Sequence, residues 1–356
     1  MRPLIAYFSE AALENNLAIL KGKAPNSKSC AVIKANAYGH RVENLIPILN
    51  QSVDYMAVAI REEADDIRHK GGILPILLLE GVFAEEEYQI AAKQNYCVAV
   101  GNMKQLEMLQ GMVLEKPLKI FLKVDTGMHR LGFSPEEVPH IVAELEKLSS
   151  VASITLMTHF ATSDEKDSPL LERQVARMKT LDCLQLPQTL ANSAALLTLP
   201  VTHHDIVRMG ISLYGISPID DSVGADFGLK PLITLTSKVI HTTMIEVGES
   251  VGYGAKFIAP ETMQIGVIAC GYADGYPREI TKDAYVLVGK YKAPIIGRPA
   301  MDMMMIDLRE VPKSSWDERV EIFGDALPLE KVATWAGTIP YTILTHIAPR
   351  VHFLKR

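Results

Sequence analysis

The sequence lacks the features of a nucleic-acid surface or a membrane protein. Its 36 lysines and arginines are outnumbered by 42 aspartates and glutamates, for a net charge of −6, whereas a nucleic-acid surface needs clustered positive charge. No stretch approaches the roughly 18 consecutive apolar residues of a membrane helix. The first ten residues, MRPLIAYFSE, contain no apolar core of signal-peptide length. We therefore expect a cytoplasmic protein.

The cysteines and histidines do not have the spacing of a metal site. The 4 cysteines lie far apart and form no CxxC pair, so we expect reduced, packed thiols. His203 and His204 are adjacent, but no third ligand lies near them in the sequence. No bound metal is expected.

Short apolar runs alternate with longer amphipathic segments over the first two thirds of the chain. Such runs suit strands that are buried on both faces of a parallel sheet. The segments between them, such as 61–70 and 134–148, have apolar residues at helical spacing, and Ser134 followed by two glutamates resembles a helix start. The eight runs are 29–34, 54–59, 75–80, 96–101, 119–124, 153–158, 188–193 and 205–210. This alternation predicts an α/β fold, an N-terminal (β/α)8 TIM barrel over residues 8–228.

The pattern changes after about residue 229. Segments such as 233–247 and 263–272 are rich in β-branched residues and are separated by glycine-containing turns, and a helical pattern recurs only at 329–337. We therefore expect a second, mainly antiparallel β domain over residues 229–356, with residues 1–7 packed against it.

Polar and charged residues follow the ends of several of the eight runs. Barrel enzymes place their chemistry at the C-terminal ends of the strands, so these residues are candidates for one shared site. A ring of such side chains at one rim is hard to explain by packing. The candidates are Lys34, Lys123, Arg130, His159, Asn192, Ser193, Arg208 and Gly210.

Lys34, within AVIKANAYGH, allows two interpretations. A lysine at a strand end most often extends into water. A partly desolvated lysine instead loses its proton more easily and can attack an aldehyde to form a Schiff base. The small residues 35–37 leave room for a flat ring beside it. Tyr38 and Gly39 could form an ordinary turn, or they could supply a hydroxyl and a close backbone approach for a phosphate.

Each of the other candidates also allows two interpretations when it is considered alone. The segment 208–212, RMGIS, could be a tight turn or a phosphate cup, because loops after strands seven and eight of such barrels often hold phosphate on backbone N–H groups. His159 could be a satisfied core histidine or a hydrogen-bonding relay. Lys123 and Arg130 would repel each other at one rim, so either an anion lies between them or one of them is modified. Tyr253, between two glycines, could be a hairpin tip or an exposed functional tyrosine.

Together and in this order, the motifs resemble those of alanine racemases. The motifs are AVIKANAYGH, LKVDTGMHRLGF, MTHFATSD, ANSAA, RMGISLYG, VGYG, GYADGY and GRPAMD. The resemblance runs from about residue 4 to the C-terminal HIAPRVH, and it implies an isomerase that uses pyridoxal 5′-phosphate (PLP) to interconvert L- and D-alanine. It also implies a (β/α)8 barrel with a C-terminal β domain, in a head-to-tail homodimer with shared active sites.

The resemblance assigns cofactor contacts. Lys34 resembles the lysine that binds the cofactor covalently, and Arg208 the arginine that faces its pyridine nitrogen. Arg130 resembles the residue that contacts the phenolic oxygen and the substrate carboxylate. Lys123 resembles a lysine that is often carbamylated, and a carbamate there would hold Arg130 and remove the repulsion. Phosphate contacts are implied for Tyr38, Ser193, Gly210 and Ile211, and further cofactor contacts for His159 and Asn192.

Racemisation needs one acid/base group on each face of the substrate Cα. The resemblance assigns Lys34 to the D-enantiomer and Tyr253 of the partner subunit to the L-enantiomer, with His159 bridging Arg208 to that tyrosine. The implied corridor residues are Met301 and Asp302 near the substrate carboxylate, Tyr272 at an inner gate, and Asp164, Arg278 and Arg298 in an outer polar lining.

One departure and several alternatives stay open. Some family members have a phosphate-side tyrosine near the C-terminus, whereas the matching position here is Pro349, with Tyr341 nearby in the sequence. A racemase of wider or different specificity, for example for serine, is the nearest alternative. Barrel-type PLP decarboxylases usually place an acid at the pyridine nitrogen, against which Arg208 argues. PLP-binding carriers lack a β domain with Tyr253. The role could be D-alanine supply for peptidoglycan or alanine catabolism.

Overall fold

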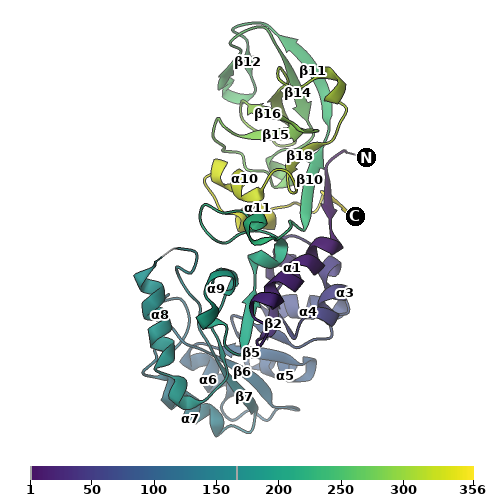
Figure 1. Ribbon diagram of the computed structural model, residues 1–356. Helices are drawn as coiled ribbons and strands as arrows, with labels where there is room; N and C mark the ends of the chain where they lie inside the picture. The colour runs from purple at the N-terminus through teal and green to yellow at the C-terminus, as the bar shows by residue number, and fades with distance from the viewer. Residues whose placement is uncertain (1, 166) are drawn as a thin grey trace.

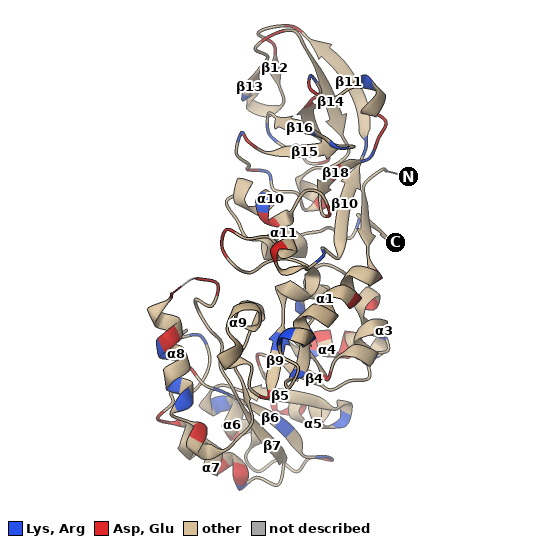
Figure 2. Ribbon diagram, viewed as in Figure 1, with Lys and Arg blue, Asp and Glu red and all other residues tan. Residues whose placement is uncertain are grey.

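The protein consists of two lobes stacked end to end in an elongated molecule (Figure 1). The computed structural model describes residues 2–165 and 167–356. Residues of both charge signs occur in each lobe (Figure 2). None of the helices in the described part of the chain has the length and hydropathy of a bilayer crossing.

The lower lobe is a barrel of eight parallel strands. Its order is β8-β7-β6-β5-β4-β3-β2-β9, and the gap between β8 and β9 is bridged by the Arg208 N–H donating to the Ala191 carbonyl at 3.0 Å. The strands are β2 (Lys28–Val32), β3 (Tyr55–Val58), β4 (Ile76–Leu78), β5 (Tyr96–Val100), β6 (Leu118–Lys123), β7 (Val151–Met157), β8 (Gln188–Thr189) and β9 (Ile206–Met209). Each of the eight expected runs overlaps one of these strands, which confirms the barrel prediction.

Helices cover the outside of the barrel because their apolar faces pack on the strands (Figure 1). They are α1 (Glu10–Lys23), α3 (Val42–Ser52), α4 (Arg61–His69), α5 (Glu85–Gln94), α6 (Met103–Leu109), α7 (Val138–Glu146), α8 (Pro169–Lys179) and α9 (Ser193–Thr198). The short α2 (Lys34–Tyr38) lies instead at the C-terminal end of β2. The start expected at Ser134 is wrong, since α7 begins at Val138. The Ser134 N–H instead donates to the Glu137 carboxylate at 2.8 Å, in a turn before the helix.

The upper lobe contains a nine-stranded sheet that takes in both ends of the chain. Its order is β11-β14-β17-β16-β15-β18-β10-β1-β19, antiparallel except that β1 runs parallel to β19. Its strands are β1 (Ile5–Phe8), β10 (Ile233–Ser237), β11 (Val239–Ile245), β14 (Met263–Ile268), β15 (Tyr285–Val288), β16 (Tyr291–Ile296), β17 (Met304–Asp307), β18 (Val320–Phe323) and β19 (His352–Lys355), and a separate pair is β12 (Ser250–Val251) with β13 (Phe257–Ile258).

Two short helices of the upper lobe face the barrel, α10 (Leu329–Trp335) and α11 (Pro340–Thr345). The sequence predicted the first and missed the second, although Pro340 stands at the favoured first position of a helix. The 3-10 turns are η1 (Asp182–Leu184), η2 (Pro200–Thr202), η3 (Ile211–Tyr214), η4 (Gly224–Phe227), η5 (Tyr253–Ala255), η6 (Tyr272–Asp274) and η7 (Lys313–Ser315). The division between residues 228 and 229 stays a prediction.

A buried carboxylate joins the two chain ends to the upper lobe. The Asp274 side chain is 0% exposed and accepts hydrogen bonds from the guanidinium groups of Arg2 and Arg350. It also accepts from the Gly271 N–H at 2.9 Å. Arg350 pairs in addition with Asp302 at 2.7 Å. A buried charge with this many partners is stable only while all of them remain in place.

We predict that Asp274→Asn destabilises the protein, by about 2 kcal/mol at pH 7, because two arginines lose their shared partner. Burial raises the pKa of the Asp274 carboxyl, but its hydrogen bonds from Arg2, Gly271 and Arg350 outweigh that effect and hold the pKa below 3.8. The ionised Asp274 side chain therefore stabilises the folded protein fully above the unfolded-state pKa of about 3.9. This stabilisation is lost as the pH falls through the pKa of Asp274 in the folded protein.

Urea unfolding at pH 7 and at a series of acidic pH values measures this difference between the variant and the wild type. The exposed Asp317→Asn is the control and should unfold like the wild type. A difference for Asp274→Asn that stays constant down to acidic pH would contradict the ion-pair explanation.

Candidate functional site

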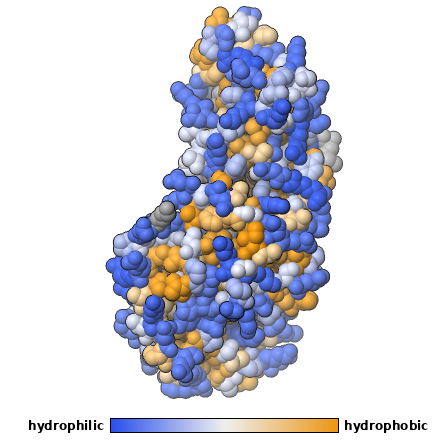
Figure 3. All heavy atoms as spheres, viewed as in Figure 1, coloured by the Kyte–Doolittle hydropathy of each residue, from blue (hydrophilic) through white to orange (hydrophobic). Residues whose placement is uncertain are grey.

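A cavity of about 840 Å3 opens at the C-terminal ends of the barrel strands, between the two lobes. Hydrophobic residues gather around the concave junction of the lobes in the view of Figure 3. The cavity brings together the predicted residues Lys34, Tyr38, Lys123, Arg130, His159, Asp164, Asn192, Ser193, Arg208, Gly210 and Ile211. These residues, from the ends of five strands or the loops beyond them, thus share one space.

Lys34 lies at the start of a left-handed turn. Helix α2 is not an ordinary helix, since Ala35, Asn36, Ala37 and Tyr38 have φ of 50°, 52°, 55° and 49°. One such residue is uncommon, and the left-handed conformation costs roughly 1–2 kcal/mol for each non-glycine residue. The turn directs the Lys34 and Tyr38 side chains to the same cavity, which the sequence did not reveal beyond the small size of residues 35–37.

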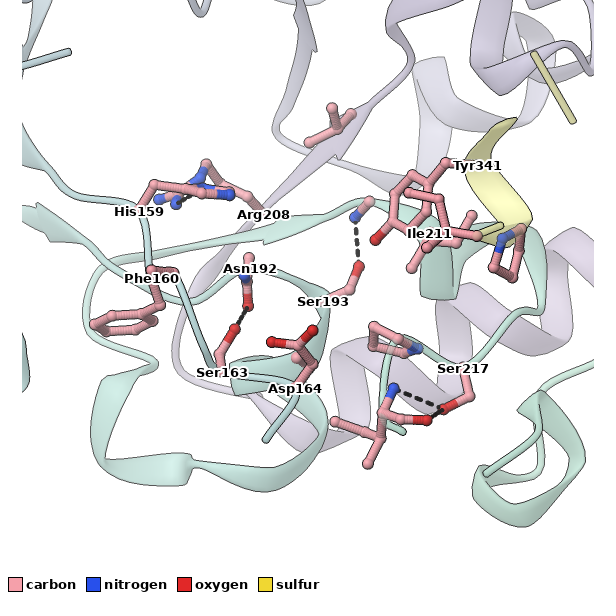
Figure 4. Close-up of a pocket in the computed structure, with 18 of the residues that line it drawn as sticks. His159, Phe160, Ser163, Asp164, Asn192, Ser193, Arg208, Ile211, Ser217 and Tyr341 are labelled. Carbon is pink, nitrogen blue, oxygen red and sulfur yellow. Dashed lines mark hydrogen bonds between the residues drawn. The ribbon is translucent and has the colours of Figure 1, made fainter. Parts of the chain in front are cut away.

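The segment after β9 forms an anion cradle. The Ser193 hydroxyl accepts from the Gly210 N–H at 2.9 Å and from the Ser212 N–H at 3.3 Å (Figure 4). A Cβ on Gly210 would lie 3.3 Å from the Ser193 hydroxyl and 3.5 Å from the Tyr38 hydroxyl. Backbone N–H groups at a turn start, flanked by two hydroxyls, suit a phosphate. The bare Cα of Gly210 leaves the space that such a group needs.

Tyr341, on α11, completes this end of the cavity from the upper lobe. Its ring centre is 5.7 Å from that of Tyr38, and Figure 4 shows it beside Ile211. Burial raises the pKa of Tyr341 to about 12, so its hydroxyl stays protonated. Pro349, the position that the resemblance matched to a phosphate-side tyrosine, is exposed and lies outside the cavity, whereas Tyr341 lines it.

Arg208 is a buried cation held by neutral oxygen atoms. It is 4% exposed and donates to the carbonyl and hydroxyl of Thr189, both at 2.8 Å, and to the carbonyls of Thr158 at 2.7 Å and Leu190 at 3.1 Å. In the described part of the chain no carboxylate forms an ion pair with it. Burial lowers the pKa of Arg208 to about 10, which leaves it charged at neutral pH.

His159 accepts from Arg208. Its Nδ1 lies 3.4 Å from the Arg208 Nη2, and the two side chains are side by side in Figure 4. A guanidinium only donates, so Nδ1 accepts and the imidazole proton lies on Nε2. Burial, and then the positive charge of Arg208, lowers the pKa of His159 to about 3. His159 is therefore a neutral group that can donate onward from Nε2.

Positive charge is concentrated in this cavity. Burial, and then the charges of Arg208, Arg130 and Lys34, lowers the pKa of Lys123 to about 8. Among the residues that the structure describes, the Lys123 Nζ has one long hydrogen bond, to the Leu79 carbonyl at 3.4 Å. A lysine in this environment has an appreciable neutral fraction, and the cavity as a whole favours an anionic ligand.

Asn192 acts as a helix cap. Its side-chain oxygen accepts from the Ala195 N–H at 3.1 Å and from the Ser163 hydroxyl at 3.0 Å (Figure 4). It thereby fixes the start of α9, where Ser193 stands. Asp164 lies at the rim on the neighbouring loop.

The upper lobe supplies the opposite wall. The Glu330 carboxylate on α10 accepts from the N–H groups of Ser217 and Gly224, both at 2.8 Å. This contact ties the loop after η3 to the upper lobe, and no sequence pattern indicated it. Within residues 2–165 and 167–356, no three His, Cys, Asp or Glu side chains converge as metal ligands.

The other predicted residues lie on the upper lobe, outside the cavity of the same chain. Tyr253 is 71% exposed and Met301 53% exposed. Arg278 and Arg298 both pair with Glu279, at 2.7 and 3.7 Å. The remaining members are Tyr272 in η6 and Asp302 beside Arg350. One chain therefore does not bring these residues to Lys34.

Comparisons with known proteins agree over the full length. The alanine racemase N-terminal domain model matches residues 8–218, and the C-terminal domain model matches 232–354. The alanine racemase of Stutzerimonas stutzeri is 42% identical over 354 residues, which cover 99% of this chain and 98% of the relative. The biosynthetic alanine racemase of Pseudomonas aeruginosa is 41% identical over 352 residues, 99% of this chain and 98% of the relative.

Solved structures give the same result. The crystal structure of biosynthetic alanine racemase from Pseudomonas aeruginosa has a TM-score of 0.97 at 40% identity, and the alanine racemase from Acinetobacter baumannii has 0.92 at 36%, each covering 100% of both chains. On the family models and these full-length relatives, the chain belongs to the alanine racemase family.

Proposed function

We propose that this protein is an isomerase that interconverts L-alanine and D-alanine. The observation that carries the proposal is the shared cavity of Lys34 and the anion cradle at Gly210, in a chain of the alanine racemase family. Members of that family depend on PLP. The cradle fits the cofactor phosphate, and Lys34 fits its aldehyde.

Each end of the cofactor has protein groups suited to it. The Gly210 and Ile211 N–H groups and the hydroxyls of Tyr38 and Ser193 would hold the phosphate, and Lys34 Nζ would bind the aldehyde carbon. When bound, the cofactor withdraws electrons from the substrate and acidifies its Cα–H. Arg208, as a permanent donor, would face the pyridine nitrogen and leave that nitrogen unprotonated.

Two acid/base groups would exchange the Cα proton from opposite faces. Lys34 Nζ would remove the proton from D-alanine, and Tyr253 of the partner subunit would remove it from L-alanine. A tyrosine with an ordinary pKa of about 10 is a poor base at neutral pH. The Arg208–His159 pair, with a proton on His159 Nε2, would stabilise the phenolate form of that tyrosine.

A head-to-tail homodimer would complete each site. Tyr253, Met301 and Tyr272 are exposed on the upper lobe, away from the cavity of their own chain. In such a dimer the partner's Tyr253 and Met301 would approach the barrel, with the partner's Tyr272, Arg278 and Arg298 along the access corridor. We propose a cytoplasmic enzyme that supplies D-alanine for peptidoglycan, since its relative in Pseudomonas aeruginosa is named a biosynthetic alanine racemase.

Lys123 is proposed to carry a carbamate. A neutral amine adds CO2 with loss of one proton, and a pKa lowered to about 8 makes that form available near neutral pH. The resulting anion would hold Arg130, whose side chain would contact the cofactor's phenolic oxygen and the substrate carboxylate.

We predict that Lys34→Ala abolishes both D-alanine formation from L-alanine and the visible absorbance of the bound cofactor. A coupled assay for D-alanine, with and without added PLP, measures the first, and a spectrum of the purified protein the second. The control is Lys28→Ala, an exposed lysine at the start of β2, the strand that precedes Lys34. An unchanged spectrum would exclude Lys34 as the covalent anchor, and serine turnover exceeding that of alanine would favour the wider-specificity alternative.

A shared site predicts that two inactive variants complement each other. Lys34→Ala and Tyr253→Phe should each be impaired as homodimers, the latter mainly in proton removal from L-alanine. Co-expression should restore about a quarter of wild-type activity, because half of the random dimers have one site with both residues intact. Each variant mixed with itself is the control. No recovery in an isolated heterodimer would show that Lys34 and Tyr253 do not meet across subunits.

We predict that Lys123→Ala lowers turnover and that a small added carboxylate, such as acetate, partly restores it by replacing the carbamate. Lys119→Ala, an exposed residue on the same strand β6, should behave like the wild type. Full activity of Lys123→Ala without acetate would reject the carbamate.

A further inference from the structure

The left-handed turn next to Lys34 must be held in place by contacts outside itself. Four successive non-glycine residues at φ near +50° are unfavourable compared with a right-handed turn. Within the turn, the Ala37 N–H donates to the Ile33 carbonyl at 2.9 Å, and the Gly39 N–H donates to the Ala35 carbonyl at 3.0 Å. Right-handed turns make bonds of the same kind, so these two do not select the left-handed form.

Side chains hold the far end of the turn. The Asn36 side-chain oxygen accepts from the Val42 N–H at 2.9 Å. His40 is buried, and its Nδ1 lies 3.1 Å from the Ala37 carbonyl and 3.0 Å from the Tyr38 carbonyl. A ring nitrogen facing two carbonyls must donate, so the proton lies on Nδ1. These contacts fix the exit of the turn near Tyr38, and they leave the entrance at Lys34 to other groups.

Glu63, on α4, holds the entrance. One of its carboxylate oxygens accepts from the Ala35 N–H at 2.6 Å, and the other accepts from the Ala59 N–H at 2.9 Å. Ala35 is the residue directly after Lys34, and Ala59 directly follows β3. The carboxylate thus joins the ends of two neighbouring barrel strands. Glu63 is not among the residues that line the cavity, so it would act without touching a ligand.

Charge makes this bridge stronger than an ordinary pair of hydrogen bonds. An ionised carboxylate accepting from backbone N–H groups forms bonds about twice as strong as neutral ones. It also needs both of its oxygen atoms, because the two N–H groups belong to different loops. An amide side chain of the same shape offers one accepting oxygen, and its NH2 group would face the second N–H.

We propose that Glu63 is a positioning residue for cofactor binding. By bridging Ala35 and Ala59 it keeps the turn left-handed, and it thereby holds Lys34 Nζ and the Tyr38 hydroxyl in the arrangement that binds the two ends of PLP. This role rests on the proposed function, because it concerns the cofactor of that same site.

The test compares apoenzymes in their affinity for PLP, measured by titration of cofactor absorbance, and in their thermal unfolding without cofactor. Glu63→Gln should weaken PLP binding about tenfold, the loss of one charge-assisted hydrogen bond. The unfolding temperature of the apoenzyme should change little. Glu62→Gln is the matched control, since Glu62 is the exposed neighbour on α4 that pairs with Arg61 at 3.0 Å, and it should match the wild type.

A second substitution distinguishes a role of Glu63 in positioning the turn from a role in stabilising helix α4. Glycine adopts positive φ without the penalty of other residues, so Ala35→Gly should recover part of the lost affinity when combined with Glu63→Gln. Unchanged affinity in Glu63→Gln, or a loss that Ala35→Gly does not reduce, would overturn the proposal. If the wild-type protein bound no PLP or formed no D-alanine, the proposed function itself would be refuted. If the wild type were active and Glu63→Gln bound PLP with the same affinity, only the role of Glu63 would be refuted.

Discussion

The burial of Arg208 without a carboxylate partner governs the chemistry of the whole cavity. Four neutral oxygen atoms hold the guanidinium, so its positive charge acts on the surrounding groups without local neutralisation. That charge, together with burial, keeps His159 neutral and lowers the pKa of Lys123. The same field favours anionic ligands, and the N–H cradle at Gly210 lies on the adjoining loop. The cavity is therefore electrostatically prepared for a phosphate and a carboxylate before either arrives.

Backbone geometry adds a second level of preparation. The left-handed turn at residues 35–38 uses conformations that ordinary residues avoid. It is held by Glu63 on α4 and by the hydrogen bonds of Asn36 and His40 at its far end. Strain of this kind persists only where the surrounding structure determines it. Rigid strands set the position of Lys34, and the turn sets its direction. The upper lobe then closes the space through Glu330 and Tyr341, so the site depends on both lobes of the chain.

Much of the fold and of the cavity could be predicted because it depends on local patterns. The eight apolar runs mark the barrel strands, and the residues that follow them, from Lys34 to Gly210, converge because parallel strands end at one rim. Contacts between segments that are distant in the sequence are not marked by any local sequence pattern. Glu63 on Ala35, Arg2 and Arg350 on Asp274, and Tyr341 against Tyr38 each join elements whose distance in space is unreadable in the sequence. The left-handed turn was hidden for another reason, since no glycine marks it.

The placement of β1 between β10 and β19 constrains the order in which the molecule can assemble. The barrel strands all lie between Lys28 and Met209, so the barrel has its full set of partners once that part of the chain has been synthesised. The first strand made, Ile5–Phe8, has its hydrogen-bonding partners at Ile233–Ser237 and His352–Lys355. One edge of β1 can pair once β10 has been made, whereas its other edge stays open until β19 is available. The sheet of the upper lobe is therefore complete only after β19 has joined it, and the barrel needs no strand from that lobe.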